Sequence, residues 1–258
     1  MKQKIVILAF VILLFFPGIP LLFSQAIEEG KNPGTPKKQT SPHPGRDAPL
    51  WDKGKNESGT VMPTIRKVAD GVFRIGRVTV NKNEEYVLVS GEVNLQEGIV
   101  EYLACGEAGK LHESVLKLDV EPFHLQIALL LMGIEPGKNR FKRQGHQGMP
   151  VGDPVELWVS WLGPEKTKIK YRAEDLLLSK KTNQSMKKTH WIYTGSQIVN
   201  GKFMAQIEQS IVATYHDPYA MIDHPLPTGG DDTHYWANHK ILPAKGVPVK
   251  LRIRKFDK

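Results

Sequence analysis

The stretch "GKLHESVLKLDVEPFHLQIALLLMG", residues 109–133, joins an expected strand to the strongest helix signal in the chain. Pro122 suits the first position of a helix, and Gly133 suits the position just past its end. Between them the residues are apolar on every side apart from His124 and one glutamine, so we expect the helix, about 122–132, to be buried. The stretch therefore predicts a core helix packed against a sheet.

Along the rest of the domain the hydrophobic period is mostly two, and turn-forming residues separate short runs of β-branched and aromatic residues. Such runs predict strands joined by turns. The expected strands are 72–80, 85–93, 98–105, 154–161, 167–174, 196–206, 210–215 and 249–256. Together with the helix they predict an α+β fold, mainly an antiparallel β-sheet with one buried core helix (about 122–132).

The first residues predict export. A positive start is followed by an unbroken apolar run over 5–16, helix-breaking Pro17 and Gly18, and small residues before position 27. This layout is typical of a secretory signal peptide, 1–26, rather than of a transmembrane helix. We expect a periplasmic or extracellular protein with no transmembrane helix in the mature chain. Whether the segment is cleaved or kept as an anchor stays open.

The segment 27–65 is rich in proline, glycine and lysine and poor in aliphatic residues, so it predicts a disordered tether. The remaining 66–258 is long enough for one globular domain with a single core. The formal charge of +8 becomes +6 without the two lysines of 1–26. For an exported protein this favours an envelope protein, or an anionic envelope polymer or lipid, as partner, and it argues against nucleic acid.

Cys105 is the only cysteine, which excludes an internal disulfide and an iron–sulfur cluster held by thiolates. We expect it to be a small buried apolar residue.

His112 and Glu113 precede the helix at the start of an expected strand over 111–119. Alternation along that strand places His112 on the apolar face and Glu113 on the opposite face. His124, in the first helical turn, should lie near the far end of the strand, so a metal shared by the two histidines is disfavoured. A structural hydrogen-bonding role and a site at the strand end both remain open for this pair.

The late segment 216–239 contains four histidines and four aspartates. One interpretation is a surface loop whose aspartates hydrogen-bond their own turns. The other is a divalent metal site, with zinc as an example, which keeps an open position for a hydrolytic water. Its candidate ligands are His112, Glu113, Asp231, Asp232 and His234.

Two expected strands alternate strictly between apolar and basic residues. Their cations are Lys168, Lys170 and Arg172 in one strand, and Lys250, Arg252 and Arg254 in the other. Strict alternation implies one face on the core and one cationic face in water. That face is either simply solvated, with lysines protecting strand edges, or it binds an anionic partner.

Four phrases, "GKLHESVL", "HLQIALLLMGIEPG", "WIYTGS" and "GGDDTHYWANHKILPAKGVPVKL", occur in this order. The chain from about Val72 to Arg254 thereby resembles the YdjY-like domain family of exported bacterial proteins of unknown function. Some members are described as ferredoxin-like, which implies several cysteines that bind an iron–sulfur cluster. This chain has one cysteine and so cannot hold such a cluster by thiolates. The resemblance places these residues in one recurring pattern: Lys110, His112, Glu113, Trp191, Ser196, Asp231, Asp232 and Asn238.

The resemblance brings no established activity, and whether the protein is an enzyme stays open. The sequence favours a non-catalytic binding or interaction module of the cell envelope. Its candidate binding residues are Lys110, His112, Glu113, Trp191, Ser196 and Asn238. The alternative is the metal-dependent site formed by the His112/Glu113 segment and the Asp231/Asp232 loop.

Overall fold

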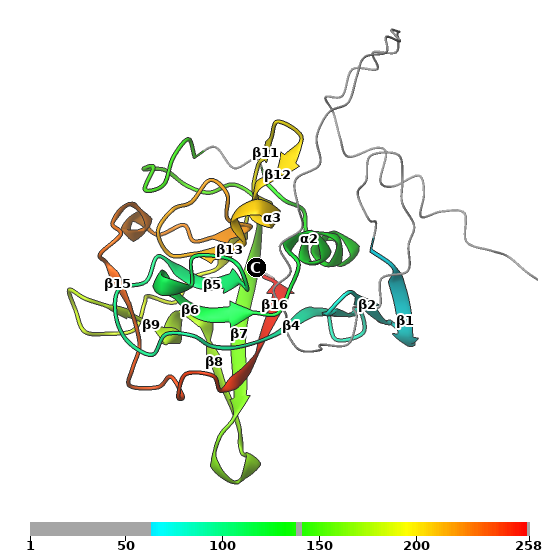
Figure 1. Ribbon diagram of the computed structural model, residues 1–258, viewed down its shortest axis with the longest axis horizontal. Helices are drawn as coiled ribbons and strands as arrows, with labels where there is room; N and C mark the ends of the chain where they lie inside the picture. Colours follow the sequence, from blue (N-terminus) through cyan, green and yellow to red (C-terminus); the bar gives the residue numbers. More distant parts are fainter. Residues whose placement is uncertain (1–62, 138–140, 257–258) are drawn as a thin grey trace, which may run out of the picture. The chain divides into compact units, whose positions relative to one another are not determined.

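The computed structural model describes residues 63–137 and 141–256, which form a β-rich domain (Figure 1). Its strands are β1 Ile65–Ala69, β2 Val72–Ile75, β3 Val78–Asn81, β4 Tyr86–Val93, β5 Tyr102–Gly106, β6 Ser114–Leu118, β7 Asp153–Leu162, β8 Lys168–Arg172, β9 Leu177–Ser179, β10 Trp191–Tyr193, β11 Ile198–Val199, β12 Lys202–Phe203, β13 Ser210–Ala213, β14 Ile222–Asp223, β15 Tyr235–Ala237 and β16 Pro248–Lys255. The α-helices of the described residues are α2 Pro122–Leu131 and α3 Met204–Glu208. Short 3₁₀ turns are η1 Leu111–Glu113, η2 Pro164–Lys166, η3 Ala173–Leu176 and η4 Pro227–Gly230.

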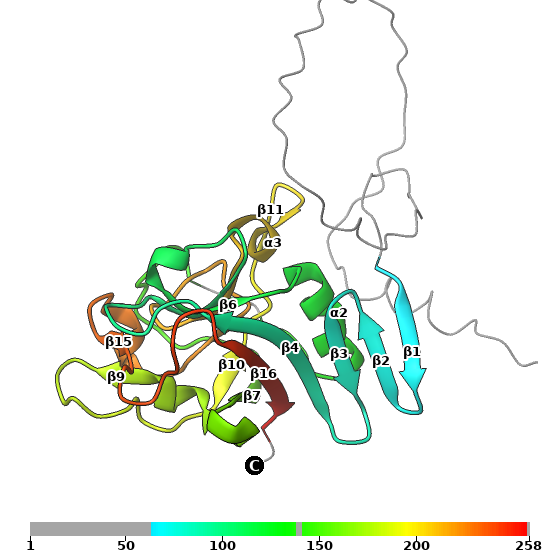
Figure 2. The ribbon, with the colours of Figure 1, turned by 60° about the horizontal axis from the view of Figure 1, so that its bottom comes forward.

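Eight strands close into a barrel in the order β4, β16, β7, β10, β14, β13, β5 and β6. The ring closes because β6 also pairs with β4, where Gly91 lies opposite Leu118 and Glu92 opposite Lys117. Two pairings, β13 with β14 and β5 with β6, are parallel, so the sheet is mixed. Strands β1 to β3 continue the sheet beyond β4, as Figure 2 shows.

Two long strands, β4 and β7, each pair with two different strands in succession along the same side. β4 pairs with β3 through its first half and with β6 through its second half. β7 pairs with β10 near its start and with β8 from Trp158 to Leu162. β16 lies between β4 and β7 and pairs with both. β4, β16, β7 and β8 therefore form one continuous wall.

The α+β prediction, a mainly antiparallel sheet over one core helix, is wrong. A helix lies where the sequence predicted one, but it packs against β2, β3 and α3, and Leu130 is 42% exposed. The strands of the closed barrel contribute much of the core, and Leu125, Ala128 and Leu129 of α2 join the same buried cluster from outside the barrel. The physical reason is that closure lets the inner faces of the strands bury one another, so no helix is needed to cover them.

The ends of α2 follow from the sequence. Pro122 occupies the first turn, where its missing N–H costs no helical hydrogen bond. At the other end the N–H of Gly133 donates to the Leu130 carbonyl, and the N–H of Ile134 donates to the Leu129 carbonyl. This is a Schellman motif, and it requires the positive φ of 70° that Gly133 adopts.

Alternation decides which side chains enter the core. In β16 the side chains of Val249, Leu251 and Ile253 are buried, and β7 buries Val155, Leu157 and Val159 in the same way. The residues between them face outward, as the sequence predicted. Cys105 is fully buried, which confirms the expectation for this residue, and burial raises the pKa of its thiol to about 12.

The expected signal peptide, 1–26, lies outside the described residues, as does most of the expected tether, 27–65. Over 63–137 and 141–256, no helix combines the length and apolar character that crossing a membrane requires.

Candidate functional site

The first group of candidate residues gathers around Glu101, just before β5. Lys110 Nζ lies 3.7 Å from Glu113 Oε1 and donates to the Tyr102 hydroxyl at 3.3 Å. The Tyr102 hydroxyl in turn donates to Asp217 Oδ2 at 2.7 Å. The charges of Lys110, Glu113 and Asp232 all act on the Glu101 carboxyl.

Glu101 holds its proton unusually tightly. Burial raises the pKa of this carboxyl to about 7, and the negative charges of Glu113 and Asp232 add to the effect, while Lys110 opposes it. Glu101 also shares a hydrogen bond with Glu113. The segment of Glu113 and the loop of Asp232 therefore both act on one carboxyl, which links the two segments that the metal hypothesis joined.

The other proposed metal ligands make protein contacts. Asp231 Oδ1 accepts hydrogen bonds from the backbone and hydroxyl of Thr233, which lower the pKa of the carboxyl. His234 lies with Nε2 3.4 Å from Ser179 Oγ and Nδ1 3.8 Å from Asp231 Oδ2. Among the described residues, no three side chains of histidine, cysteine, aspartate or glutamate are grouped so as to hold a metal ion.

His112 does not point to the apolar face, as the expected strand over 111–119 implied. Residues 111–113 form the η1 turn, and β6 begins only at Ser114. The His112 side chain is 79% exposed, with Nε2 3.6 Å from Glu113 Oε2. The alternation argument failed because it holds only within a strand, and residues 111–113 precede the strand. His124, by contrast, lies against Gly76, and burial lowers its pKa.

Three candidate binding residues make internal contacts. Trp191 is fully buried in the core. Ser196 Oγ donates to the Tyr219 carbonyl at 2.6 Å and accepts from the Ala205 N–H at 3.0 Å. Asn238 Nδ2 donates to the Asp175 carbonyl at 2.8 Å. These contacts join separate loops to the barrel.

Part of the histidine-rich segment is buried rather than displayed. His216 Nδ1 lies 2.8 Å from Asp223 Oδ1, and both side chains are at most 1% exposed. His224 Nδ1 accepts from the Leu226 N–H, so its Nε2 carries the proton that bonds to the Thr214 carbonyl. Burial lowers the pKa of His224, which keeps the ring neutral. The surface-loop interpretation is wrong for these residues, which form an internal polar layer.

The second site is a groove on the outer face of β4, β16, β7 and β8. Its volume is about 600 Å³. Its lining includes Leu88, Ser90, Trp158, Ser160, Lys168, Lys170, Lys250 and Arg252. We call it the cationic groove. It is built by register, because Ser160 of β7 lies opposite Lys250 on one side and Lys170 on the other. Residues opposite each other in antiparallel strands share a face.

The cations of the cationic groove are not paired with carboxylates of the described residues. Within the described chain, none of Lys168, Lys170, Lys250 and Arg252 forms an ion pair. Lys170 Nζ lies 4.0 Å from the centre of the Trp158 ring, and Arg252 lies 3.9 Å from that of Tyr86. Burial lowers the pKa of Lys170, and the charges of Arg252, Lys168 and Arg254 lower it further, while the charge of Glu156 opposes them. The groove is thus a region of mutual cation repulsion.

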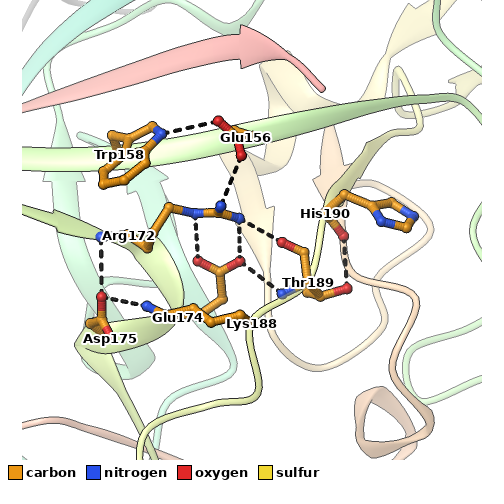
Figure 3. A network of polar contacts seen from close by, with 8 residues as sticks. All are labelled: Glu156, Trp158, Arg172, Glu174, Asp175, Lys188, Thr189 and His190. Carbon is orange, nitrogen blue, oxygen red and sulfur yellow. Dashed lines mark hydrogen bonds and ion pairs between the residues drawn. The ribbon is translucent and has the colours of Figure 1, made fainter. Parts of the chain in front are cut away.

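Arg172 does not belong to the cationic groove, although the sequence placed it on the same basic face as Lys168 and Lys170. Its guanidinium donates to Glu174 at 2.8 and 3.2 Å and to Glu156 at 2.9 Å, as Figure 3 shows. It also donates to the Thr189 carbonyl. Glu174 is completely buried, so Arg172 neutralises an internal charge. Arg172 also forms an ion pair with Glu156, the carboxylate that lies beside the groove.

A family model described as the YdjY domain matches residues 78–254. The chain belongs to the YdjY domain family. The match runs from β3 into β16 and so includes every strand of the barrel. No curated protein and no solved structure matches the chain.

In this YdjY domain the sequence revealed the basic residues of the groove but not their arrangement. Alternation put Lys170 and Lys250 on outward faces, yet it could not show that β8 and β16 both flank β7. Glu101 was missed altogether. It occurs in the phrase "GIVEYLAC" without any local feature that sets it apart, and only the tertiary contacts with Glu113 and Asp232 reveal it.

Proposed function

We propose that this YdjY domain is a non-catalytic binding module of an exported protein, and that it binds an anionic partner through the cationic groove. The observation that carries the proposal is a concave surface lined by four cations that form no ion pair with the described residues. An anion bound there would replace repulsion with attraction, because Lys170 already lies within the fields of Arg252 and Lys168.

Export is part of the proposal and is supported by the sequence of residues 1–26. In the periplasm or outside the cell, the anionic partners within reach are envelope polymers, lipid headgroups and acidic proteins. The metal-dependent alternative lacks a group of three candidate ligands among the described residues.

The proposal is tested by binding of a labelled linear polyphosphate to the full-length chain. The variant is Lys170→Gln/Lys250→Gln/Arg252→Gln. We expect its affinity to fall about tenfold or more, because each charge-assisted contact contributes about 1.5 kcal/mol when well formed. Circular dichroism and thermal unfolding establish that the variant is folded. Lys250→Gln alone, at an exposed position, gives a smaller loss and serves if the triple variant is unstable.

The matched control is Lys82→Gln/Lys187→Gln/Lys202→Gln, which removes the same number of charges from exposed positions outside the groove. It should bind nearly as well as the wild type. An equal loss in both triple variants would show that net charge alone drives binding and would refute the proposed site.

A further inference from the structure

The cations of the groove are arranged as a track. The outward-facing residues of β7 from Leu162 to Glu156 follow at intervals of two, and we call each of them a level. Each level lies opposite a different cation. Lys168 lies opposite Leu162, and Lys170 and Lys250 lie opposite Ser160. Arg252 lies opposite Trp158, and Arg254 lies opposite Glu156. At the last of these levels Glu156 is itself an anion, but its carboxylate pairs with Arg172. Every outward level of this part of β7 therefore has beside it at least one cation that forms no ion pair within the described chain.

The dimensions of the track follow from strand geometry. Outward levels of a strand are two residues apart, or about 6.6 Å, so the six-residue step from Leu162 to Glu156 covers about 20 Å. β8 and β16 lie one strand spacing to either side of β7, which sets the two rows of cations about 10 Å apart. A single compact anion over Ser160 can contact Lys170 and Lys250, but it leaves the cations at both ends unpaired.

Two cations of the groove lie over aromatic rings. Lys170 lies over Trp158, and Arg252 lies over Tyr86. Arg172 approaches the same Trp158 ring at 5.4 Å. Each of these rings supports a cation that lies over it. The lysine and the arginine of these pairs are thereby held in position to contact an anion.

We infer that the occupant of the cationic groove is an extended linear polyanion that lies along β7 and carries regularly spaced phosphate or carboxylate charges. The inference rests on the proposed function and specifies its ligand. A repeating chain of charges matches a repeating track of cations, whereas a compact ion pairs with only one level of it. A flat lipid surface would meet the rims of the groove rather than its floor at Ser160.

The test uses the two ends of the track. Lys168→Gln and Arg254→Gln are compared with Lys250→Gln at the centre, all in the full-length chain. Tripolyphosphate, long-chain polyphosphate, polygalacturonate and phosphatidylglycerol vesicles serve as probes, with affinities measured by calorimetry. Each end variant should weaken binding of a long polymer about threefold. It should also reduce the slope of log affinity against log salt concentration by about 1. Binding of tripolyphosphate should change only with Lys250→Gln.

The outcomes separate this inference from the proposed function. If end variants leave polymer binding unchanged while Lys250→Gln weakens every probe, the groove binds a compact anion and the inference is overturned. Groove-dependent binding of vesicles without binding of either polymer overturns it as well. If no probe responds to Lys250→Gln or to the triple variant, the proposed function itself fails. Preference between polyphosphate and polygalacturonate identifies the charged group.

Discussion

Arg172 lies on the outer side of the sheet, but its guanidinium pairs with a carboxylate in the interior. Its side chain is 16% exposed, and its partner Glu174 is fully buried. Arg172→Ala should lower the free energy of unfolding by about 3 kcal/mol, because a buried carboxylate loses its counter-charge. Urea unfolding measures the change. Adding Glu174→Gln to Arg172→Ala should restore part of the loss, and a single variant as stable as the wild type would contradict this account.

Glu101 makes stability depend on pH. Its folded pKa of about 7 lies above the ordinary 4.5, so the folded state binds the proton more tightly than the unfolded state. Its contribution to stability is therefore complete below about pH 4.5, declines as pH rises to 7, and is flat above.

Glu101→Gln should remove this decline and raise stability at pH 8 by about 1 kcal/mol, a value reduced for the partial exposure of the group. Urea unfolding at pH 5 and pH 8 tests it, with Glu107→Gln at an exposed position as control. A stability gain at pH 5 equal to that at pH 8 would rule out the proposed cause.

At the scale of elements, Gly133 ends α2 and turns the chain back to the core. Its φ of 70° is strained for any residue with a Cβ, but no atom lies within 4 Å of where that Cβ would stand. Gly133→Ala should therefore cost about 1 kcal/mol through backbone strain alone. Gly133→Asn should cost less, because asparagine tolerates this conformation. Thermal unfolding that ranks asparagine below alanine would contradict the cap.

At the scale of the whole molecule, Gly91 permits the barrel to close. A Cβ at Gly91 would stand 2.4 Å from the Lys117 carbonyl oxygen, in the strand that closes the ring. Gly91→Ala should cost about 2 kcal/mol or more, since backbone must shift to admit the methyl group. Amide hydrogen exchange should accelerate in β6. Ser90→Ala, on the outward face of β4, is the control and should leave exchange in β6 unchanged. Unchanged exchange in Gly91→Ala would show that closure does not depend on this contact.

Features that depend on near neighbours in the chain could be predicted from the sequence. Period-two alternation predicted the long strands β4, β7 and β16 and their outward cations, and Pro122 and Gly133 predicted both ends of α2. The order of the phrases shared with YdjY domains predicted the family. Each of these signals is contained within a few residues or in their linear order.

Features that depend on partners distant in the chain became visible only in the folded molecule. Closure of the barrel rests on the pairing of β4 with β6, and the groove rests on β8 and β16 flanking β7. The neutralisation of Arg172 and the raised pKa of Glu101 arise in the same way. Alternation assigns a residue to a face but does not say which strand lies beside it, and a charge takes its chemistry from its spatial neighbours.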